Sequence, residues 1–453
     1  MVKVLTSPAQ NERRRTIYEY DALCADSQKP TGDTLAIPDS TFRWLEDKCL
    51  KFDAKNETAW LKLVRRGGCR AVQVTNYVGV IQAPDGYQIE VLPKIGKVTE
   101  RNEAAYSKIR KILIDMICCL QGFEHIQIDS ARIAAAKMPL LDVFIQDFLR
   151  TVERIVKRGL RSNYVSRQDN LFALRGKLLM ASHLRQNLCR ADRFFTEHDE
   201  FETDRPENRL LHTALRRVLA LPTSHANNRL ARELAFAFAD VPLSAQPRLD
   251  FQRVRLDRGM SYYEPALAWA RLILDDKSPV TGAGEETAPS LLFPMEKVFE
   301  AFVAKHLAKQ LTKPHTLKKQ AQSRYLVNHD GGDLFQLRPD LLVADSIGAK
   351  LVLDTKWKLL ETANVNKGKY ETKYGLAQSD FYQLLAYGLN YLDGKGDMVL
   401  IYPKTDTFKK PLEVFKFNKP GGLRLWVLPF CLENKKLITP QQALLPCLEP
   451  YPA

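Results

Sequence analysis

One stretch of the chain, residues 337–358, restricts the fold more than any other. It holds two apolar runs, at 341–343 and 351–353, on either side of a short turn that contains Gly348. Two short apolar runs separated by such a turn predict an antiparallel hairpin with a buried face. A hairpin of this kind needs a sheet and a covering layer around it, so the sequence indicates a mixed α and β domain here.

The same hairpin brings charged residues together at its open end. When it is centred on Ile347, Asp340 falls directly opposite Asp354, and Lys356 shares their face two residues further on. Two carboxylates this close repel each other unless a cation joins them, and hard oxygen ligands suit Mg²⁺ or Mn²⁺. On this pattern alone, a solvated hairpin end with a Lys–Asp pair is the alternative.

Composition points to an acidic polymer as a partner. The chain has 453 residues, of which 45% are hydrophobic and 26% charged, so we expect a globular protein of two or three domains. Its formal net charge is +14. A strongly basic protein favours a polyanion, most simply nucleic acid.

The sequence also indicates a compartment. The eight cysteines are scattered, and none is spaced as in a C-x-x-C zinc site, so we expect free thiols in a reducing cytoplasm. The first 15 residues contain no apolar segment typical of a signal peptide. Because no run of about 18 apolar residues occurs, no membrane span is expected.

Periodicity divides the rest of the chain into strand-like and helix-like stretches. Strands are predicted at 71–81 and 87–93, around a Pro-Asp-Gly turn. Helical spacing predicts a helix from residue 103 and further helices at 140–158, 208–221 and 228–238. A polar stretch at 275–289 is interpreted as a linker. Beyond it we expect a helix at 294–311, the hairpin, a helix at 379–392, and strands at 398–402, 412–417 and 423–428.

These elements predict an α+β multidomain protein in three parts. Residues 1–100 form a β-rich N-terminal region, residues 101–280 a mainly helical middle region, and residues 285–453 a C-terminal α/β domain. The acid pair lies in the last part.

The residues around the hairpin resemble the PD-(D/E)xK nucleases. Pro339-Asp340 followed by Asp354-Thr355-Lys356 matches the signature of that superfamily. The preceding helix offers Glu296 and Glu300, four residues apart, and an upstream helical Glu is the usual additional metal ligand in this superfamily. The following helix carries Gln383 and Tyr387, which resembles the Q-x-x-x-Y motif of the RecB-like branch.

A wider set of segments resembles the McrC family, the nuclease subunits of McrBC modification-dependent restriction systems. One is Asp-Glu-Phe at 199–201, followed by the segment at 204–211 that contains Pro-Glu-Asn-Arg, which together resemble the family's D-E-F…(P)-x-N-R-x-L signature. The resemblance runs from about residue 70 to 403. Further matching segments lie at 89–95, 174–177, 295–303 and 380–387. The segment from Met295 resembles the family's M-x-x-L-F-E, which selects Glu300 over Glu296.

The resemblance implies a partner and a substrate. McrC subunits dock on a hexameric AAA+ GTPase, McrB, through their N-terminal part and stimulate it, and McrB recognises the methylated base. This chain contains no G-x-x-x-x-G-K-[ST] segment, so we expect GTP to bind the partner only. The expected substrate is double-stranded, methylated DNA, cut in defence against foreign DNA.

The expected site follows from both arguments. Asp340 and Asp354 hold Mg²⁺, with Mn²⁺ as a possible substitute, and Glu300 and the carbonyl of Thr355 add ligands. Lys356 acts either on the attacking water or on the developing charge. Gln383 and Tyr387 hold the site or a DNA phosphate. Two alternatives remain: an adaptor that only activates the motor, and a stand-alone RecB-like repair nuclease.

Overall fold

The computed structural model describes most of the chain. Its described residues are 13–28, 32, 34–55, 60–95, 101–120, 138–221, 223–274, 291–360, 374–418, 421–440 and 446–451. The stretch at 275–289, interpreted above as a linker, lies outside them. Contacts divide the chain into two compact units. Unit 1 comprises Met1–Glu124, Ile128–Lys137 and Leu292–Ala453, and unit 2 comprises His125–Gln127 and Met138–Leu291. The expected C-terminal region therefore shares a unit with the N-terminal one.

The N-terminal part of unit 1 is built on two four-stranded sheets. The first has the order β1 (Arg14–Tyr18), β7 (Gln88–Leu92), β6 (Tyr77–Gln82) and β11 (Leu291–Pro294). The second has the order β3 (Thr34–Ile37), β2 (Ala22–Ala25), β5 (Cys69–Val74) and β4 (Leu61–Arg66). Helix α2 (Asp39–Lys55) packs against the second sheet, and the 3₁₀ turn η1 (Asp26–Gln28) precedes β3.

The predicted strand at 71–81 is in fact two strands, one in each sheet. The chain turns at Thr75 and Asn76, where the Thr75 amide donates to the Trp60 carbonyl and the Asn76 carbonyl accepts from the Met295 amide. These bonds interrupt the ladder, so β5 and β6 pair in different sheets. The predicted hairpin with residues 87–93 is confirmed, because β6 and β7 pair antiparallel around the turn at Asp85 and Gly86.

The C-terminal part of unit 1 is a seven-stranded sheet. Its strand order is β12 (Thr316–Lys319), β15 (Leu341–Ala344), β16 (Ala349–Thr355), β17 (Gly396–Pro403), β19 (Leu423–Cys431) and β18 (Phe415–Lys416), with β20 (Lys436–Leu437) also on β19. Strands β16, β17 and β19 run parallel, and β15 pairs antiparallel with β16. A separate pair, β13 (Arg324–His329) and β14 (Gly332–Leu337), precedes β15.

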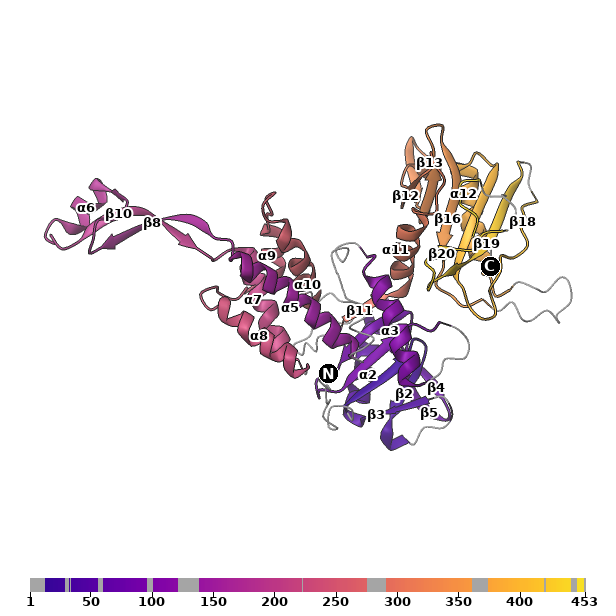
Figure 1. Cartoon of the computed structure of the whole chain (residues 1–453), viewed down its shortest axis with the longest axis horizontal. Helices are drawn as coiled ribbons and strands as arrows, with labels where there is room; N and C mark the ends of the chain where they lie inside the picture. The colour runs from indigo at the N-terminus through magenta and orange to yellow at the C-terminus, as the bar shows by residue number, and fades with distance from the viewer. Residues whose placement is uncertain are drawn as a thin grey trace. The chain divides into compact units, whose positions relative to one another are not determined.

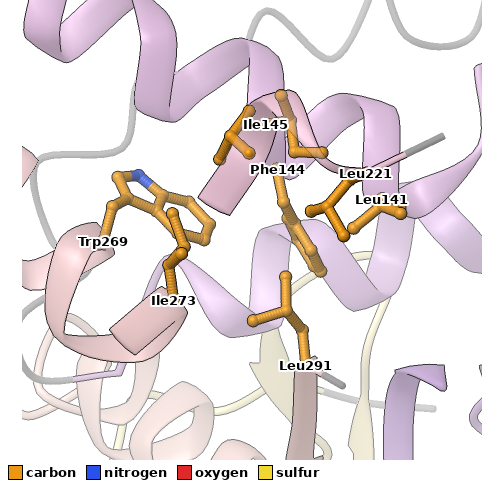
Figure 2. Close-up of a pocket in the computed structure, with 8 residues that line it drawn as sticks. Leu141, Phe144, Ile145, Leu221, Trp269, Ile273 and Leu291 are labelled. Atoms are coloured by element: carbon orange, nitrogen blue, oxygen red, sulfur yellow. The ribbon is translucent and has the colours of Figure 1, made fainter. Parts of the chain in front are cut away.

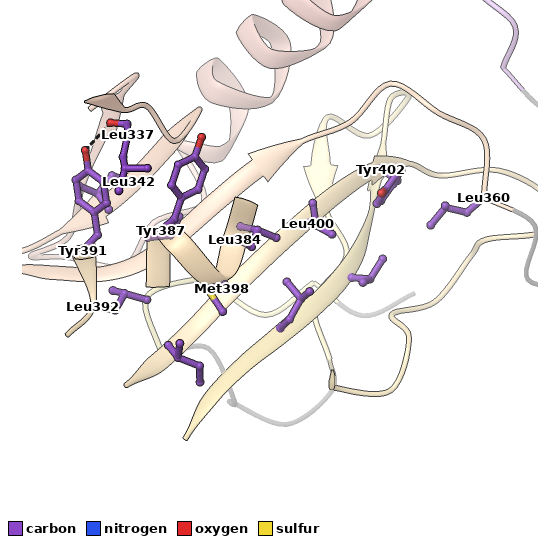
Figure 3. Packing of buried hydrophobic residues seen from close by; sticks show 14 of the residues in the cluster. Leu337, Leu342, Leu360, Leu384, Tyr387, Tyr391, Leu392, Met398, Leu400 and Tyr402 are labelled. Carbon is purple, nitrogen blue, oxygen red and sulfur yellow. Dashed lines mark hydrogen bonds between the residues drawn. The ribbon is translucent and has the colours of Figure 1, made fainter. Parts of the chain in front are cut away.

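Two helices pack against this sheet. Helix α11 (Met295–Leu307) contacts β16 and also α3 (Glu103–Ile117), and α12 (Gln378–Tyr391) contacts β16 and β17. Gly388 allows the close approach of α12, because a Cβ atom there would lie 2.6 Å from the Met398 sulfur. Figure 3 shows the apolar cluster between α12 and the sheet, which includes Leu384, Met398 and Leu400. The order predicted from sequence is therefore confirmed, with α11 ending earlier than expected.

Unit 2 is a helical bundle with a projecting arm. The bundle contains α5 (Leu140–Arg158), α7 (Pro206–Leu219), α8 (His225–Ala237), α9 (Pro247–Arg253), η2 (Ser261–Tyr263) and α10 (Glu264–Leu274). The helices predicted at 140–158, 208–221 and 228–238 are confirmed to within a few residues. Apolar side chains of α5, including Phe144, meet Trp269 and Ile273 in the interior (Figure 2). The space left there is only about 10 Å³, so this is core packing and not a ligand site.

The arm is a pair of nine-residue strands that leaves the bundle. Strands β8 (Asn163–Leu171) and β10 (Phe194–Glu202) pair antiparallel along their whole length. Short strand β9 (Lys177–Leu178) and helix α6 (Met180–Asn187) lie at the far end (Figure 1). Among the described helices of both units, none combines the length and the apolarity needed to cross a membrane.

Candidate active site

The hairpin β15–β16 has the register expected from sequence. Leu341 pairs with Leu353 and Leu342 with Val352, so the position before β15 lies opposite Asp354. Asp354 is 1% exposed within β16. Asp340 is half-buried, and its Oδ2 accepts bonds of 2.8 Å from both the amide and the hydroxyl of Thr355. These two bonds orient the Asp340 carboxylate toward the end of β16.

Lys356 lies at the centre of a group of polar side chains. Its Nζ is 2.8 Å from Oδ2 of Asp354, an ion pair that is not well aligned as a hydrogen bond. The same Nζ is 4.0 Å from Oδ1 of Asp380 and 3.4 Å from Oε1 of Gln383. The shared face that alternation predicted for Asp354 and Lys356 is thus present.

Helix α12 contributes two polar side chains from consecutive turns. Gln383 Nε2 donates to the Tyr387 hydroxyl at 2.8 Å, and that hydroxyl donates to the carbonyl of Arg338 at 3.0 Å. Spacing of four residues places both on one helix face. The pair therefore connects the Lys356 ammonium to the backbone two residues before Asp340.

Helix α11 presents its two glutamates to different partners. Oε1 of Glu296 accepts from the side-chain Nδ2 of Asn76 at 3.0 Å, whereas Oε1 of Glu300 accepts from the side-chain Nε2 of Gln320 at 3.1 Å. The backbone amide of Gln320 in turn donates to the backbone carbonyl of Asp340 at 2.8 Å. Glu300 is therefore the glutamate tied to the acid pair, while both glutamates line the same pocket.

Burial and like charge both raise the pKa of the acidic side chains. Burial raises the pKa of Asp354 to about 7, the Asp340 carboxylate adds to the rise, and the Lys356 ammonium opposes it. Burial, and then Asp340, also raise the pKa of Glu300. For Lys356, burial lowers the pKa, but the Asp354, Asp380 and Asp340 carboxylates together outweigh it and the net pKa is raised. Lys356 is accordingly an ammonium at neutral pH.

One open pocket of about 850 Å³ in unit 1 is lined by most of the predicted site residues, namely Glu300, Asp340, Asp354, Thr355, Lys356 and Gln383. Tyr387 is not part of its lining and reaches the site only through its bond with Gln383. Its remaining wall carries basic groups, since Lys94, Lys297 and Lys358 lie there beside Lys356. Acids gathered on the floor with lysines around them suit a phosphate backbone approaching a cation site.

The donor set fits a hard divalent cation. Asp340, Asp354 and Glu300 supply the oxygen ligands that Mg²⁺ and Mn²⁺ prefer, and their mutual repulsion favours a cation among them. Among the described residues, no three His, Cys, Asp or Glu side chains are already arranged to hold a metal ion. The Lys356 ammonium occupies one oxygen of Asp354.

Sequence reasoning passed over several residues of this pocket. Asp380 lies near Lys356, and its Oδ2 accepts from the Tyr402 hydroxyl at 3.3 Å. Its place three residues before Gln383 was a usable signal, because that spacing shares a helix face. Glu19 and Tyr20 also line the pocket from the N-terminal part of unit 1. No local pattern connects them with β16.

The Asp-Glu-Phe and Pro-Glu-Asn-Arg segments lie elsewhere, at the base of the arm. Asn208, fully buried, donates to the carbonyls of Arg161 and Thr203 and accepts from the Tyr263 hydroxyl. These bonds join both strands of the arm to α7. The Pro-Glu-Asn-Arg segment therefore fastens the arm to the helical bundle. Phe201 of the Asp-Glu-Phe segment lies on the arm and is 65% exposed.

Comparisons with known proteins agree with this architecture. The family model described as "McrBC 5-methylcytosine restriction system component" matches residues 72–403. No curated protein matches the sequence significantly. A chain of a Thermococcus gammatolerans tetradecameric assembly of McrB AAA+ hexamers with bound McrC has a TM-score of 0.66 at 21% identity, over 94% of this chain and 96% of that chain.

A chain from the cryo-EM structure of the Thermococcus gammatolerans McrBC complex is also similar. It has a TM-score of 0.50 at 21% identity, over 69% of this chain and 90% of that chain. The fold and the matched region define the class as a component of McrBC restriction systems. Within that class, the chain belongs to the McrC family, as the sequence resemblance indicated.

Proposed function

We propose that this chain is the Mg²⁺-dependent DNA endonuclease subunit of a McrBC-like restriction complex. The observation that carries the proposal is the placement of Asp340 opposite Asp354, with the Lys356 ammonium 2.8 Å from Asp354 in the same pocket. Two acids and a lysine around a cation site are the group that metal-assisted phosphodiester hydrolysis requires.

Each side chain has a role that its surroundings support. Asp340, Asp354, Glu300 and the Thr355 carbonyl would hold Mg²⁺, which supplies Lewis acidity and a lowered pKa for a bound water. Thr355 orients the Asp340 carboxylate through its amide and hydroxyl. Lys356, kept protonated by its acidic neighbours, donates to the scissile phosphate and stabilises the developing charge. Gln383 and Tyr387 hold Lys356 in reach.

The proposed partner is a McrB-like AAA+ GTPase hexamer. The similar Thermococcus structures contain McrB with McrC, and no phosphate-binding loop motif occurs in this sequence, so GTP would bind the partner. The expected docking region, 1–100, offers few free apolar side chains at 77–82, because every residue of β6 is buried. The substrate proposed from the family description is double-stranded DNA that carries 5-methylcytosine.

A second docking surface deserves a test, because the arm exposes aromatic side chains. Tyr164 and Phe201 are cross-strand neighbours with ring centroids 5.1 Å apart, and they are 75% and 65% exposed. Leu174 and Leu188 are more than half exposed near the arm's end. Exposed aromatic pairs of this kind are typical anchors of protein interfaces.

A matched pair of substitutions in one hairpin tests the proposed activity. Asp354→Asn removes a charged ligand from the pocket, whereas Asp345→Asn makes the same change at the turn, where Asp345 accepts from the Ile347 and Gly348 amides. With the cognate motor and methylated plasmid DNA, we expect Asp354→Asn to abolish cleavage but keep GTPase stimulation. Asp345→Asn should cut normally. Cleavage by Asp354→Asn at the wild-type rate would refute the site, whereas GTPase stimulation without any cleavage by the wild-type chain would favour the adaptor alternative.

A further inference from the structure

Trp357, the residue after Lys356, joins three segments of unit 1. Its side chain is 9% exposed. Its indole Nε1 donates to Oε1 of Glu19 at 2.8 Å, although the two residues lie 338 positions apart in sequence. Its ring centroid is 5.3 Å from that of Phe299, the residue before Glu300. Trp357 therefore follows one proposed site residue, Lys356, and contacts the neighbour of another, Glu300.

Glu19 is the buried end of this connection. It lies directly after β1, is 1% exposed, and its Oε1 accepts a second bond of 2.9 Å from the Lys94 amide. Within the described part of the chain, its other oxygen, Oε2, is buried without a hydrogen-bond partner. A buried, incompletely paired carboxylate is costly, so its presence beside a reactive pocket favours a functional use.

The same pocket contains both ends of the connection. Glu19, Lys94 and Trp357 line it together with Asp340, Asp354 and Lys356. Trp357 has no carboxylate or amine of its own to offer a phosphate. Its contribution is the position that it imposes on the chain at Lys356 and on the face of α11 at Glu300.

We propose that Glu19 is a positioning residue of the nuclease site. Its hydrogen bond to Trp357 fixes the indole, which in turn sets the placement of Lys356 relative to Glu300. This inference rests on the proposed nuclease function and adds a residue from the N-terminal sheet to it. Glu19 itself is not expected to contact metal or DNA.

The structure offers a matched control for the test. In unit 2, Trp269 Nε1 donates to Oδ2 of the buried Asp147 at 2.9 Å, the same type of bond in a helical core. Trp357→Phe and Trp269→Phe each remove one indole donor from a buried carboxylate. Similar losses of thermal stability are expected from both, because both leave a carboxylate with one fewer partner.

Only the pair beside the pocket should affect turnover. In the assembled complex with methylated plasmid DNA and Mg²⁺, we expect Trp357→Phe and Glu19→Ala to lower kcat roughly tenfold, the effect of about 1.4 kcal/mol, with KM for DNA unchanged. The double variant should lose little more than Glu19→Ala alone, since both substitutions break the Glu19–Trp357 bond. Glu19→Gln should retain activity, because its amide oxygen accepts the same bonds. Trp269→Phe should keep the wild-type kcat.

Two results would overturn the inference, and they differ from failure of the nuclease assignment. Wild-type kcat in both Trp357→Phe and Glu19→Ala would show that the bond is only structural, as would an equal loss in Trp269→Phe. If Trp357→Phe does not fold, Glu19→Ala tests the same bond with the ring retained. Cleavage by Asp354→Asn would refute the proposed function itself, whereas an inactive Asp354→Asn with fully active Trp357→Phe refutes this inference alone.

Discussion

Two antiparallel strand pairs of this chain differ in how far their side chains are buried. In β15–β16, residues 341–344 and 351–355 are all buried, and Asp340, Asp354 and Lys356 gather at the open end. In β8–β10, six of the nine residues of β8 are exposed, and aromatic rings face outward. The same ladder of hydrogen bonds thus supports the proposed catalytic site in one place and presents a proposed docking surface in the other. The two pairs differ because other elements cover β15–β16, whereas β8 is mostly exposed.

The comparison predicts its largest effect at Lys356. Lys356→Ala should lower cleavage roughly 100- to 1,000-fold, as expected when a donor to developing charge is removed. Binding of Mn²⁺, followed by calorimetric titration, should be unchanged or tighter, because the ammonium competes for Asp354. Lys350→Ala is the control on the same strand, since Lys350 pairs with Asp345 at 3.4 Å, at the far end of the hairpin. Disappearance of Mn²⁺ binding with Lys356 would show that its role is different.

An intermediate effect is expected on the arm. Replacing both Tyr164 and Phe201 with Ser should raise the concentration of this chain needed for half-maximal GTPase stimulation about 100-fold. This assumes a loss of affinity of roughly tenfold for each interface aromatic. Mn²⁺ binding in unit 1 should not change. Phe236→Ser, an 83% exposed phenylalanine on α8, is the control and should have no effect. Full stimulation by the double variant would remove the arm from the interface and return docking to residues 1–100.

The smallest predicted effect is the pH dependence of metal binding. The pKa of Asp354 is raised to about 7, so below that pH the carboxyl group is mostly protonated, and protonation competes with metal binding. A cation needs the ionised carboxylate, and Mn²⁺ affinity should therefore rise with pH through 7. At pH 6, about a tenth of the carboxylate is ionised, which predicts roughly tenfold weaker binding than at pH 8. Titrations in buffers of different ionisation enthalpy should also detect proton release, and affinity independent of pH would contradict the buried, metal-binding role of Asp354.

The sequence was most informative where neighbours decide the geometry. Strand alternation placed Asp354 and Lys356 on one face, and helical spacing placed Gln383 with Tyr387. Each inference needs only a local turn or a helix period, so tertiary contacts had little to change.

Local rules could not find what depends on distant segments. Glu19 reaches Trp357 only because sheet and hairpin pack together, and no pattern in either segment indicates that contact. The arm was missed because the exposed residues of β8 show no alternation that a core would impose. The break at Thr75 and Asn76 was missed because it depends on bonds to Trp60 and Met295.

The pairing of β11 with β6 has a consequence for synthesis of the chain. Strand β6 ends at Gln82, but its partner β11 begins only at Leu291, so a ribosome makes all of unit 2 before the first sheet can close. Until then β6 presents an open edge, which is a site for wrong pairing. A nascent chain released before residue 291 would carry that edge permanently. Because a compact unit with many internal contacts lies between the two strands, the growing polypeptide completes that unit before the sheet is closed.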